Sequence, residues 1–371
     1  EILAAQHFQT ITSLLSNLPV NVELLTGSFP ESKKKAIIER ISSNETHILI
    51  GTHALIEDRV KFNDLGIVII DEQHRFGVEQ RAKLWMRQQP PHVLVMTATP
   101  IPRTLAMTLY GDLDVSVIDE LPAGRKPIKT MHLFESSRLR VIGFMKEQIK
   151  LGRQIYIVFP LIDESEKLDL QNLMAGYDSI QRDFPLPEYF VSMVHGKMKA
   201  KDKEQEMERF VNGKTHIMIA TTVIEVGVNV PNATVMIIEN AERFGLSQLH
   251  QLRGRVGRGA EQSFCILMSG NKLSADARER LKTMVQTNDG FQIAETDLKL
   301  RGPGDITGTQ QSGLLNLKIA ELAKDGAILE HARNAVINIL NEDPQLNSEE
   351  NKIFYRHLHQ LREQPNWSKV S

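Results

Sequence analysis

One stretch constrains this 371-residue chain more than any other: Ile67-Val68-Ile69-Ile70-Asp71-Glu72-Gln73-His74. Its four apolar, mostly β-branched residues predict a buried strand of a parallel sheet, and two adjacent carboxylates follow where that strand ends. Ligands of open α/β sheets bind at the carboxyl ends of the strands. Asp71 can therefore hold a Mg²⁺ ion that bridges phosphates, and Glu72 can polarise an attacking water. These two residues alone leave open the alternative of a solvated Asp-Glu turn.

Strand and helix patterns alternate along the chain. In the first part they predict helix 1–18, strand 20–25, helix 32–42, strand 47–50, strand 67–70, helix 80–87 and strand 93–96. A linker with Pro, Gly and charge lies at 119–127, and beyond it we expect helix 137–151, strand 154–159, a polar loop at 163–187, strand 190–194, helix 200–212 and strands 216–220 and 234–239. A helical hairpin follows at 275–286 and 292–298, and the pattern is helical beyond Gly313.

This order predicts an α/β fold class: two RecA-like domains, each with a doubly wound parallel sheet, followed by a helical hairpin and C-terminal helices. The expected domains are residues 1–120, 128–270, 271–316 and 317–371.

A second motif is Gln251-Leu252-Arg253-Gly254-Arg255-Val256-Gly257-Arg258. On a helix Gln251, Arg255 and Arg258 would share one face. Two guanidinium groups on one edge suit a γ-phosphate whose charge redistributes during transfer. The alternative is a basic, solvated helix face. Two glycines inside a helix would cost about 1 kcal/mol each relative to alanine, which disfavours that alternative.

Several motifs together resemble a known family. The run DEQHRFGVEQR at 71–81 resembles the Walker B box of the RecG family of bacterial replication-fork helicases, and 251–258 resembles motif VI of superfamily 2 helicases. Residues 220–231 resemble motif V, with Asn229 where relatives usually have an Asp thought to contact the ribose. Thr97-Ala98-Thr99-Pro100 resembles motif III. The segment 298–313, after the hairpin, resembles the family's translocation motif, although its glycines also suit a flexible loop.

The resemblance implies ATP and Mg²⁺ as cofactors and assigns roles to residues. Asp71 would hold Mg²⁺ through water, Glu72 would act as general base, and Arg255 and Arg258 would stabilise the γ-phosphate. Five further residues would bind or sense the nucleotide: Gln251, Gly227, Asn229, Thr97 and Thr99. The remaining candidates would contact DNA or couple hydrolysis to its movement: Thr26, Gly27, Ser28, Gly51, Thr52, His53, Arg301, Gln310 and Gln311.

A Walker A box, G-x-x-x-x-G-K-[ST], is missing from the sequence. Gly213-Lys214-Thr215 lacks the first glycine, because position 208 is Glu, and it precedes a strand instead of following one. In RecG relatives the phosphate loop, and further upstream the wedge domain, precede the segment matched by residues 1–7. We therefore expect a chain cut from a longer protein, with a first domain truncated at its N-terminus and with little activity by itself.

The composition further limits the kinds of site that this chain can contain and the way in which it could bind DNA. With 44 basic and 46 acidic residues, DNA binding would depend on a local concentration of basic side chains. One cysteine, Cys265, excludes an internal disulfide framework and a cysteine zinc site. No signal peptide or membrane-length apolar run is present, which favours the cytoplasm. The resemblance further implies a bacterial protein that associates with the nucleoid.

The resemblance implies a monomer that acts on branched duplex DNA, such as forks and Holliday junctions, with single-stranded DNA-binding protein as a further partner. Two alternatives stay open: a transcription-repair coupling translocase of the Mfd family, and a non-catalytic DNA- or protein-binding module.

Overall fold

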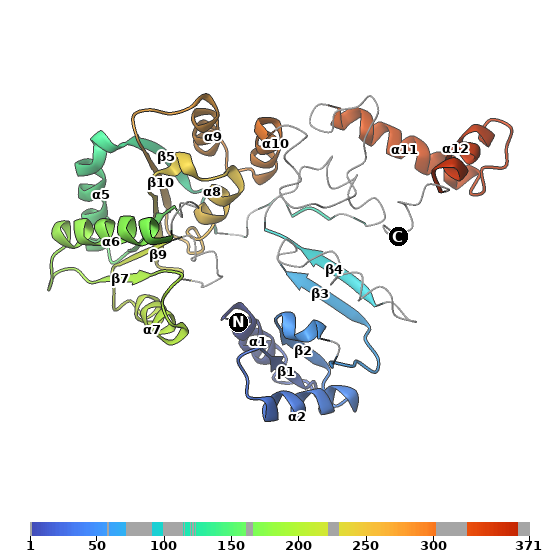
Figure 1. Ribbon diagram of the computed structural model, residues 1–371, viewed down its shortest axis with the longest axis horizontal. Coiled ribbons are helices and arrows are strands. Elements are labelled where there is room, and N and C mark those ends of the chain that lie inside the picture. Colours follow the sequence, from blue (N-terminus) through green and yellow to red (C-terminus); the bar gives the residue numbers. More distant parts are fainter. Residues whose placement is uncertain are drawn as a thin grey trace. The chain divides into compact units, whose positions relative to one another are not determined.

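The computed structural model describes residues 2–57, 59–71, 91–98, 114, 116–118, 120, 122, 124–160, 166–221, 230–301 and 325–362 (Figure 1). Six candidate residues lie outside these ranges: Glu72, Thr99, Gly227, Asn229, Gln310 and Gln311. The helix expected at 80–87 lies outside them as well.

The first part of the chain begins with α1 (Ile2–Leu14), β1 (Val22–Leu25), α2 (Glu31–Ser42), β2 (Ile48–Gly51) and the short 3-10 helix η1 (His53–Ile56). Strands β1 and β2 pair in parallel, with Leu25 opposite Gly51. Leu25, Ile37, Ile41 and Ala54 pack together in a small core that holds α2 and η1 against this pair of strands. The alternation expected from the sequence is confirmed here.

Strands β3 (Ile67–Asp71) and β4 (His92–Met96) form a second parallel pair. The described strands of this region thus form two two-stranded sheets instead of the single sheet that we expected. The expectation of a fully buried β3 was also wrong, since Ile70 is 4% exposed whereas Ile67 and Ile69 are 59% and 58% exposed. Alternate side chains of a strand point to opposite faces, and the described residues cover only one face of this pair.

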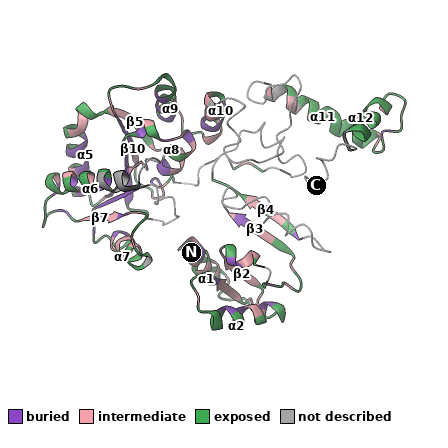
Figure 2. Cartoon of the chain, viewed as in Figure 1, coloured by how far each residue is buried: buried purple, intermediate pink, exposed green. Residues whose placement is uncertain are grey.

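A six-stranded parallel sheet forms the centre of the second part (Figure 1). Its strands are β5 (Lys129–Phe134), β6 (Gln154–Phe159), β7 (Val191–Val194), β8 (Ile217–Thr221), β9 (Ala233–Ile238) and β10 (Phe264–Ser269), in the order β5-β10-β9-β6-β8-β7. Every residue of β8 and β9 is buried, which is typical of parallel strands covered on both faces. The neighbouring strand β10 is likewise coloured mostly as buried in Figure 2, whereas α11 and α12 are coloured mostly as exposed. The predicted α/β fold class is confirmed.

Helices cover this sheet: α5 (Arg138–Lys150), α6 (Glu166–Asp183), α7 (Ala200–Val211) and α8 (Leu246–Arg253), with the short helices η3 (Glu135–Ser137) and η5 (Ala241–Arg243) at strand ends. On one face Ile155 and Ile157 of β6 pack with Met145 of α5 and Leu173 of α6. Tyr156 points to the other face, where its ring lies 4.9 Å from that of Phe210 in α7.

Helix α6 occupies the region where we expected a polar loop at 163–187, so that expectation was wrong. Leu173, Tyr177, Ile180 and Phe184 recur at spacings of four, three and four residues, and all belong to or pack against the core of the sheet. Such spacing places apolar side chains on one face of a helix. The prolines that suggested a loop, at 185 and 187, come after the helix.

The last part of the described chain is helical. Helices α9 (Ala275–Gln286) and α10 (Gly290–Arg301) form the predicted hairpin, and Ser274 caps α9 by accepting a hydrogen bond from the Ala277 amide. Helices α11 (Gly326–Glu342) and α12 (Lys352–Arg362) follow. Between them the Asp343 carboxylate accepts hydrogen bonds from the amides of Asn347 and Ser348. No helix within the described ranges is long and apolar enough to cross a membrane.

Candidate functional site

Two candidate DNA loops meet at the carboxyl edge of β1 and β2. Because Leu25 pairs with Gly51, the residues that follow each strand, Thr26 and Thr52, leave the sheet side by side. Thr26 is buried, and its hydroxyl lies 3.1 Å from that of Ser28. A methyl group at Gly51 would lie 2.1 Å from the Leu25 carbonyl oxygen, so only glycine fits this approach. The structure thus brings six candidates to one edge: Thr26, Gly27, Ser28, Gly51, Thr52 and His53.

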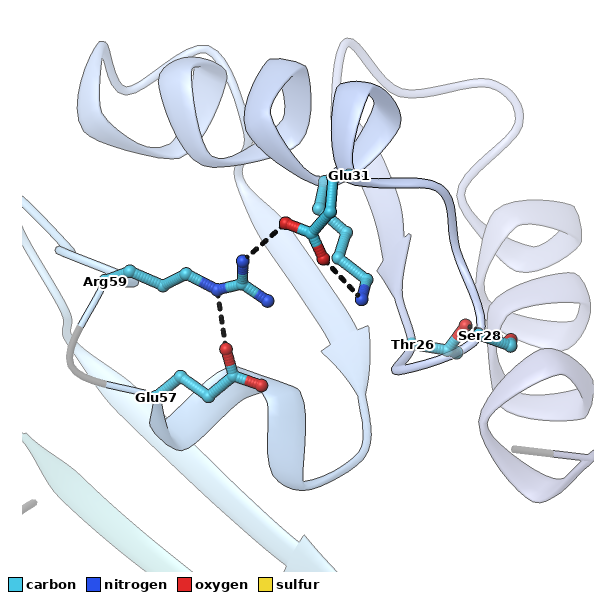
Figure 3. Close-up of polar contacts among 6 residues, drawn as sticks. Thr26, Ser28, Glu31, Glu57 and Arg59 are labelled. Carbon is cyan, nitrogen blue, oxygen red and sulfur yellow. Dashed lines mark hydrogen bonds and ion pairs between the residues drawn. The ribbon is translucent and has the colours of Figure 1, made fainter.

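An ion-pair network behind these loops was not anticipated from the sequence. Arg59 donates to Glu31, in the first turn of α2, at 2.7 Å and to Glu57, just after η1, at 2.5 Å (Figure 3). Lys34 contacts the other oxygen of Glu31 at 3.0 Å, and this hydrogen bond, with that from Arg59, lowers the pKa of Glu31. The network links the segments that follow the two loops. Only its Glu31–Lys34 pair, three residues apart on one helix, could have been found from the sequence.

The candidate magnesium ligand Asp71 ends β3. Asp71 pairs with Met96, so Thr97 follows at the same edge of β3 and β4. The side chain of Asp71 is 38% exposed, and His7 Nε2 lies 3.7 Å from its carboxylate. No group of three or more His, Cys, Asp or Glu residues in the described part of the chain could enclose a metal ion. A hydrated Mg²⁺ held by one or two carboxylates together with nucleotide phosphates needs no such group, so an accessible Asp71 fits it.

The structure corrects the expected helical face at 251–258. Helix α8 ends at Arg253, so Gln251 lies within it whereas Arg255 and Arg258 lie in the loop that follows. Gly257 has a left-handed backbone with φ of +80°, and a methyl group there would lie 2.9 Å from the Ile128 side chain. The glycines of this motif therefore lie beyond the end of the helix, and the cost of glycine inside a helix does not apply to them.

The charges of both candidate arginines nevertheless act on one buried side chain. The buried Tyr156 of β6 lies within electrostatic range of Arg255 and of Arg258, whose charges oppose the rise in its pKa that burial causes. Partial burial, and the charge of Arg125, lower the pKa of Arg258. The two arginines therefore do not share a helical face, although the charges of both reach Tyr156 in β6.

A third arginine of this motif is buried. Arg253 is 2% exposed, and burial lowers its pKa. Its guanidinium lies 3.1 Å from His250 Nδ1 and 3.5 Å from the Thr130 hydroxyl, so it joins the end of α8 to β5. No sequence signal separates this anchoring arginine from its neighbours. In the helical hairpin, the coupling candidate Arg301 is the last residue of α10.

Comparison with known proteins gives three family matches. Residues 1–108 match the DEAD/DEAH box helicase model, residues 138–260 the helicase conserved C-terminal domain, and residues 287–371 the C-terminal part of domain 3 of the ATP-dependent DNA helicase RecG. The RecG of Synechocystis is 52% identical over 346 residues, which cover 93% of this chain and 41% of that protein. The RecG of Bacillus subtilis is 52% identical over 92% of this chain and 50% of that protein.

Among solved structures, RecG bound to a three-way DNA junction aligns with a TM-score of 0.69 and 42% identity, over 89% of this chain and 42% of that one. The Mycobacterium smegmatis helicase Lhr bound to single-stranded DNA and AMP-PNP aligns with a TM-score of 0.55 at 16% identity, over 76% of this chain and 41% of that one, which shows a shared fold alone. The chain spans about half the length of the curated relatives it matches. Identity near one half over nine-tenths of its residues, together with the RecG-specific match at residues 287–371, shows that the chain belongs to the RecG family of ATP-dependent DNA helicases.

Proposed function

We propose that the protein containing this chain is an ATP-dependent DNA translocase that remodels branched duplex DNA, reversing forks and branch-migrating Holliday junctions. The observation that carries this proposal is the 42% identity to a RecG whose solved structure holds a three-way DNA junction. The expected domains, 1–120, 128–270, 271–316 and 317–371, are part of the proposal.

The nucleotide residues have separate roles in this proposal. Asp71 would hold Mg²⁺ through water, and the ion, when bound, neutralises charge on the phosphates. Glu72 would orient the attacking water and accept its proton. Arg255 and Arg258 would bind the γ-phosphate, and what supports this pairing is that the charges of both reach the buried Tyr156. The other nucleotide contacts would come from Gln251, Gly227, Asn229, Thr97 and Thr99.

The loops at the edge of β1 and β2 would hold the DNA backbone. Hydroxyl and backbone amide groups on Thr26–Ser28 and Gly51–His53 can bind phosphates without reading base sequence. Two such loops from paired strands would grip successive phosphates of one strand, and the ion pairs of Arg59 would hold the loops in place.

Arg301, Gln310 and Gln311 would transmit domain closure to the DNA. Hydrolysis needs only the nucleotide site, whereas translocation also needs a rigid element that moves with it, and the α9–α10 hairpin can act as that lever. We further propose a monomer in the bacterial cytoplasm, associated with the nucleoid, with single-stranded DNA-binding protein as a partner.

The central test is the ATPase activity of the complete gene product with and without forked DNA, beside fork unwinding. We expect DNA-stimulated hydrolysis that Asp71→Asn abolishes, because the neutral amide no longer attracts the ion. Asp64→Asn is the matched control, since Asp64 is exposed and has no ion pair within the described residues. Equal activity of the two variants would remove Asp71 from the site.

The same assays separate the alternatives. Binding of forked DNA without ATP hydrolysis would favour the non-catalytic module. Capture of RNA polymerase by the complete protein would favour a transcription-repair coupling translocase, although the RecG names of its relatives argue against that.

A further inference from the structure

The linker that precedes β5 is fastened to the loop that carries Arg255 and Arg258. Gln262 Nε2 donates to the Pro127 carbonyl at 2.8 Å, and the Lys129 amide donates to the Ser263 carbonyl at 3.0 Å. Ile128 packs over Gly257 so closely that a side chain there would meet it at 2.9 Å. These three contacts hold the linker that carries Arg125 against the motif VI loop, and they join residues 129 to 135 positions apart in the sequence.

Arg125 and Arg258 lack a compensating carboxylate among the residues that the structure describes. Arg125 is exposed and Arg258 half-buried, and within the described ranges neither lies within ion-pair distance of a carboxylate. The nearest acidic residue along the loop, Glu261, pairs with Arg153 at 2.9 Å. Burial lowers the pKa of the Arg258 guanidinium, and the nearby charge of Arg125 lowers it further. Two like charges held together without a counter-charge form a favourable place for an anion.

We propose that Arg125 binds a phosphate oxyanion jointly with Arg258, a role that no sequence motif assigned to it. The inference rests on the proposed function, which already places Arg258 at a phosphate. Guanidinium groups are planar, always charged and matched to phosphate oxygens, so two of them can grip one group from two sides. The phosphate could belong to the nucleotide or to the DNA backbone. The recognition chemistry is the same for both, and the experiment distinguishes them.

The test uses the complete gene product and three glutamine variants. Arg125→Gln removes the proposed contact, and Arg258→Gln removes its partner. Arg140→Gln is the matched control. Arg140 is exposed in the first turn of α5, after the carboxyl end of β5, whereas Arg125 precedes the amino end of that strand. Arg140 has no ion pair within the described residues. Arg125→Lys keeps the charge but loses the planar fork. Thermal unfolding of each variant verifies that the fold is intact.

Two titrations are run with each variant: one with a fluorescent, non-hydrolysable ATP analogue, and one with a labelled forked duplex in the absence of nucleotide. If the phosphate belongs to the nucleotide, Arg125→Gln should weaken binding of the ATP analogue by about threefold to tenfold and leave the affinity for the duplex unchanged. If the phosphate belongs to the DNA backbone, Arg125→Gln should weaken binding of the duplex instead. The slope of log K for duplex binding against log salt concentration should then fall in magnitude by about 0.9. Arg125→Lys should recover part of the loss, and Arg140→Gln should change neither affinity.

This inference would be overturned if Arg125→Gln left both affinities unchanged while Arg258→Gln weakened binding. The proposed function would still stand in that case. Unchanged affinities for both variants would mean that Arg258 does not bind phosphate, which is a failure of the proposed function itself. A loss in Arg140→Gln as large as that in Arg125→Gln would also overturn the inference, because the effect would then reflect overall charge.

Discussion

Gly51→Ala is the sharpest test of how the edge of β1 and β2 is built. The new methyl group would lie 2.1 Å from the carbonyl oxygen of Leu25 and 2.9 Å from a methyl of Leu55. Leu55 can change rotamer, but the Leu25 oxygen belongs to the backbone of a residue that is 1% exposed. To restore ordinary contact the two strands must move apart by at least about 1.3 Å at this end.

The size of the effect follows from two opposing contributions. Overpacking a well-packed site costs typically about 1–3 kcal/mol. Replacing glycine with alanine also reduces the freedom of the unfolded chain, which stabilises the fold by about 0.4–1 kcal/mol. We therefore expect a net local destabilisation of about 1–2 kcal/mol, which corresponds to roughly 5- to 30-fold faster amide hydrogen exchange where the strands open locally.

Hydrogen exchange measured by mass spectrometry on peptides that cover β1 and β2 tests this expectation. Gly66→Ala is the matched control, because Gly66 is exposed and a methyl group there meets nothing within 4 Å. Affinity for forked DNA should fall in Gly51→Ala alone, since Thr26 and Thr52 follow the displaced strand ends directly. If both variants exchange at the wild-type rate, the close approach at Gly51 does not hold the edge and the reasoning fails.

Three further predictions concern other parts of the molecule. Arg138→Ala should lower the free energy of unfolding by about 2–3 kcal/mol, because Glu239, with a side chain 5% exposed, loses hydrogen bonds of 2.5 and 2.7 Å. Glu135→Gln, which removes the exposed partner of Arg138, should cost less than about 1 kcal/mol, and equal losses in urea titrations would contradict this. Burial raises the thiol pKa of Cys265 to about 12, so iodoacetamide at pH 8 should label it only as the sheet unfolds; rapid labelling of folded protein would refute this. Arg301→Ala should retain DNA-stimulated ATPase while fork unwinding falls sharply, and parallel losses in phosphate-release and stopped-flow unwinding assays would place Arg301 in support of the nucleotide site.

Local sequence determined most of the secondary structure, because hydrophobic periodicity and end signals act over a few residues. Strand β6 and helix α9 lie at the predicted bounds, 154–159 and 275–286. Strand β5 was missed: its sequence, Lys-Thr-Met-His-Leu-Phe, is half-exposed and lacks a clear alternation, and it is a strand because it pairs with β10, 135 positions away. A long-range partner of this kind leaves no local pattern.

In the candidate site, too, the sequence determined some features and the tertiary structure decided the others. The sequence alone placed Asp71, Thr26 and Thr52 at strand ends, since each follows an apolar run, and the parallel pairing then set Thr26 beside Thr52. It did not determine where α8 ends or which charges meet beyond it. The helix ends at Arg253. The linker that carries Arg125 lies against the loop that carries Arg258, because Ile128 packs over Gly257 and Gln262 bonds to Pro127. Contacts between residues so far apart depend on the folded sheet, and only the tertiary structure decides them.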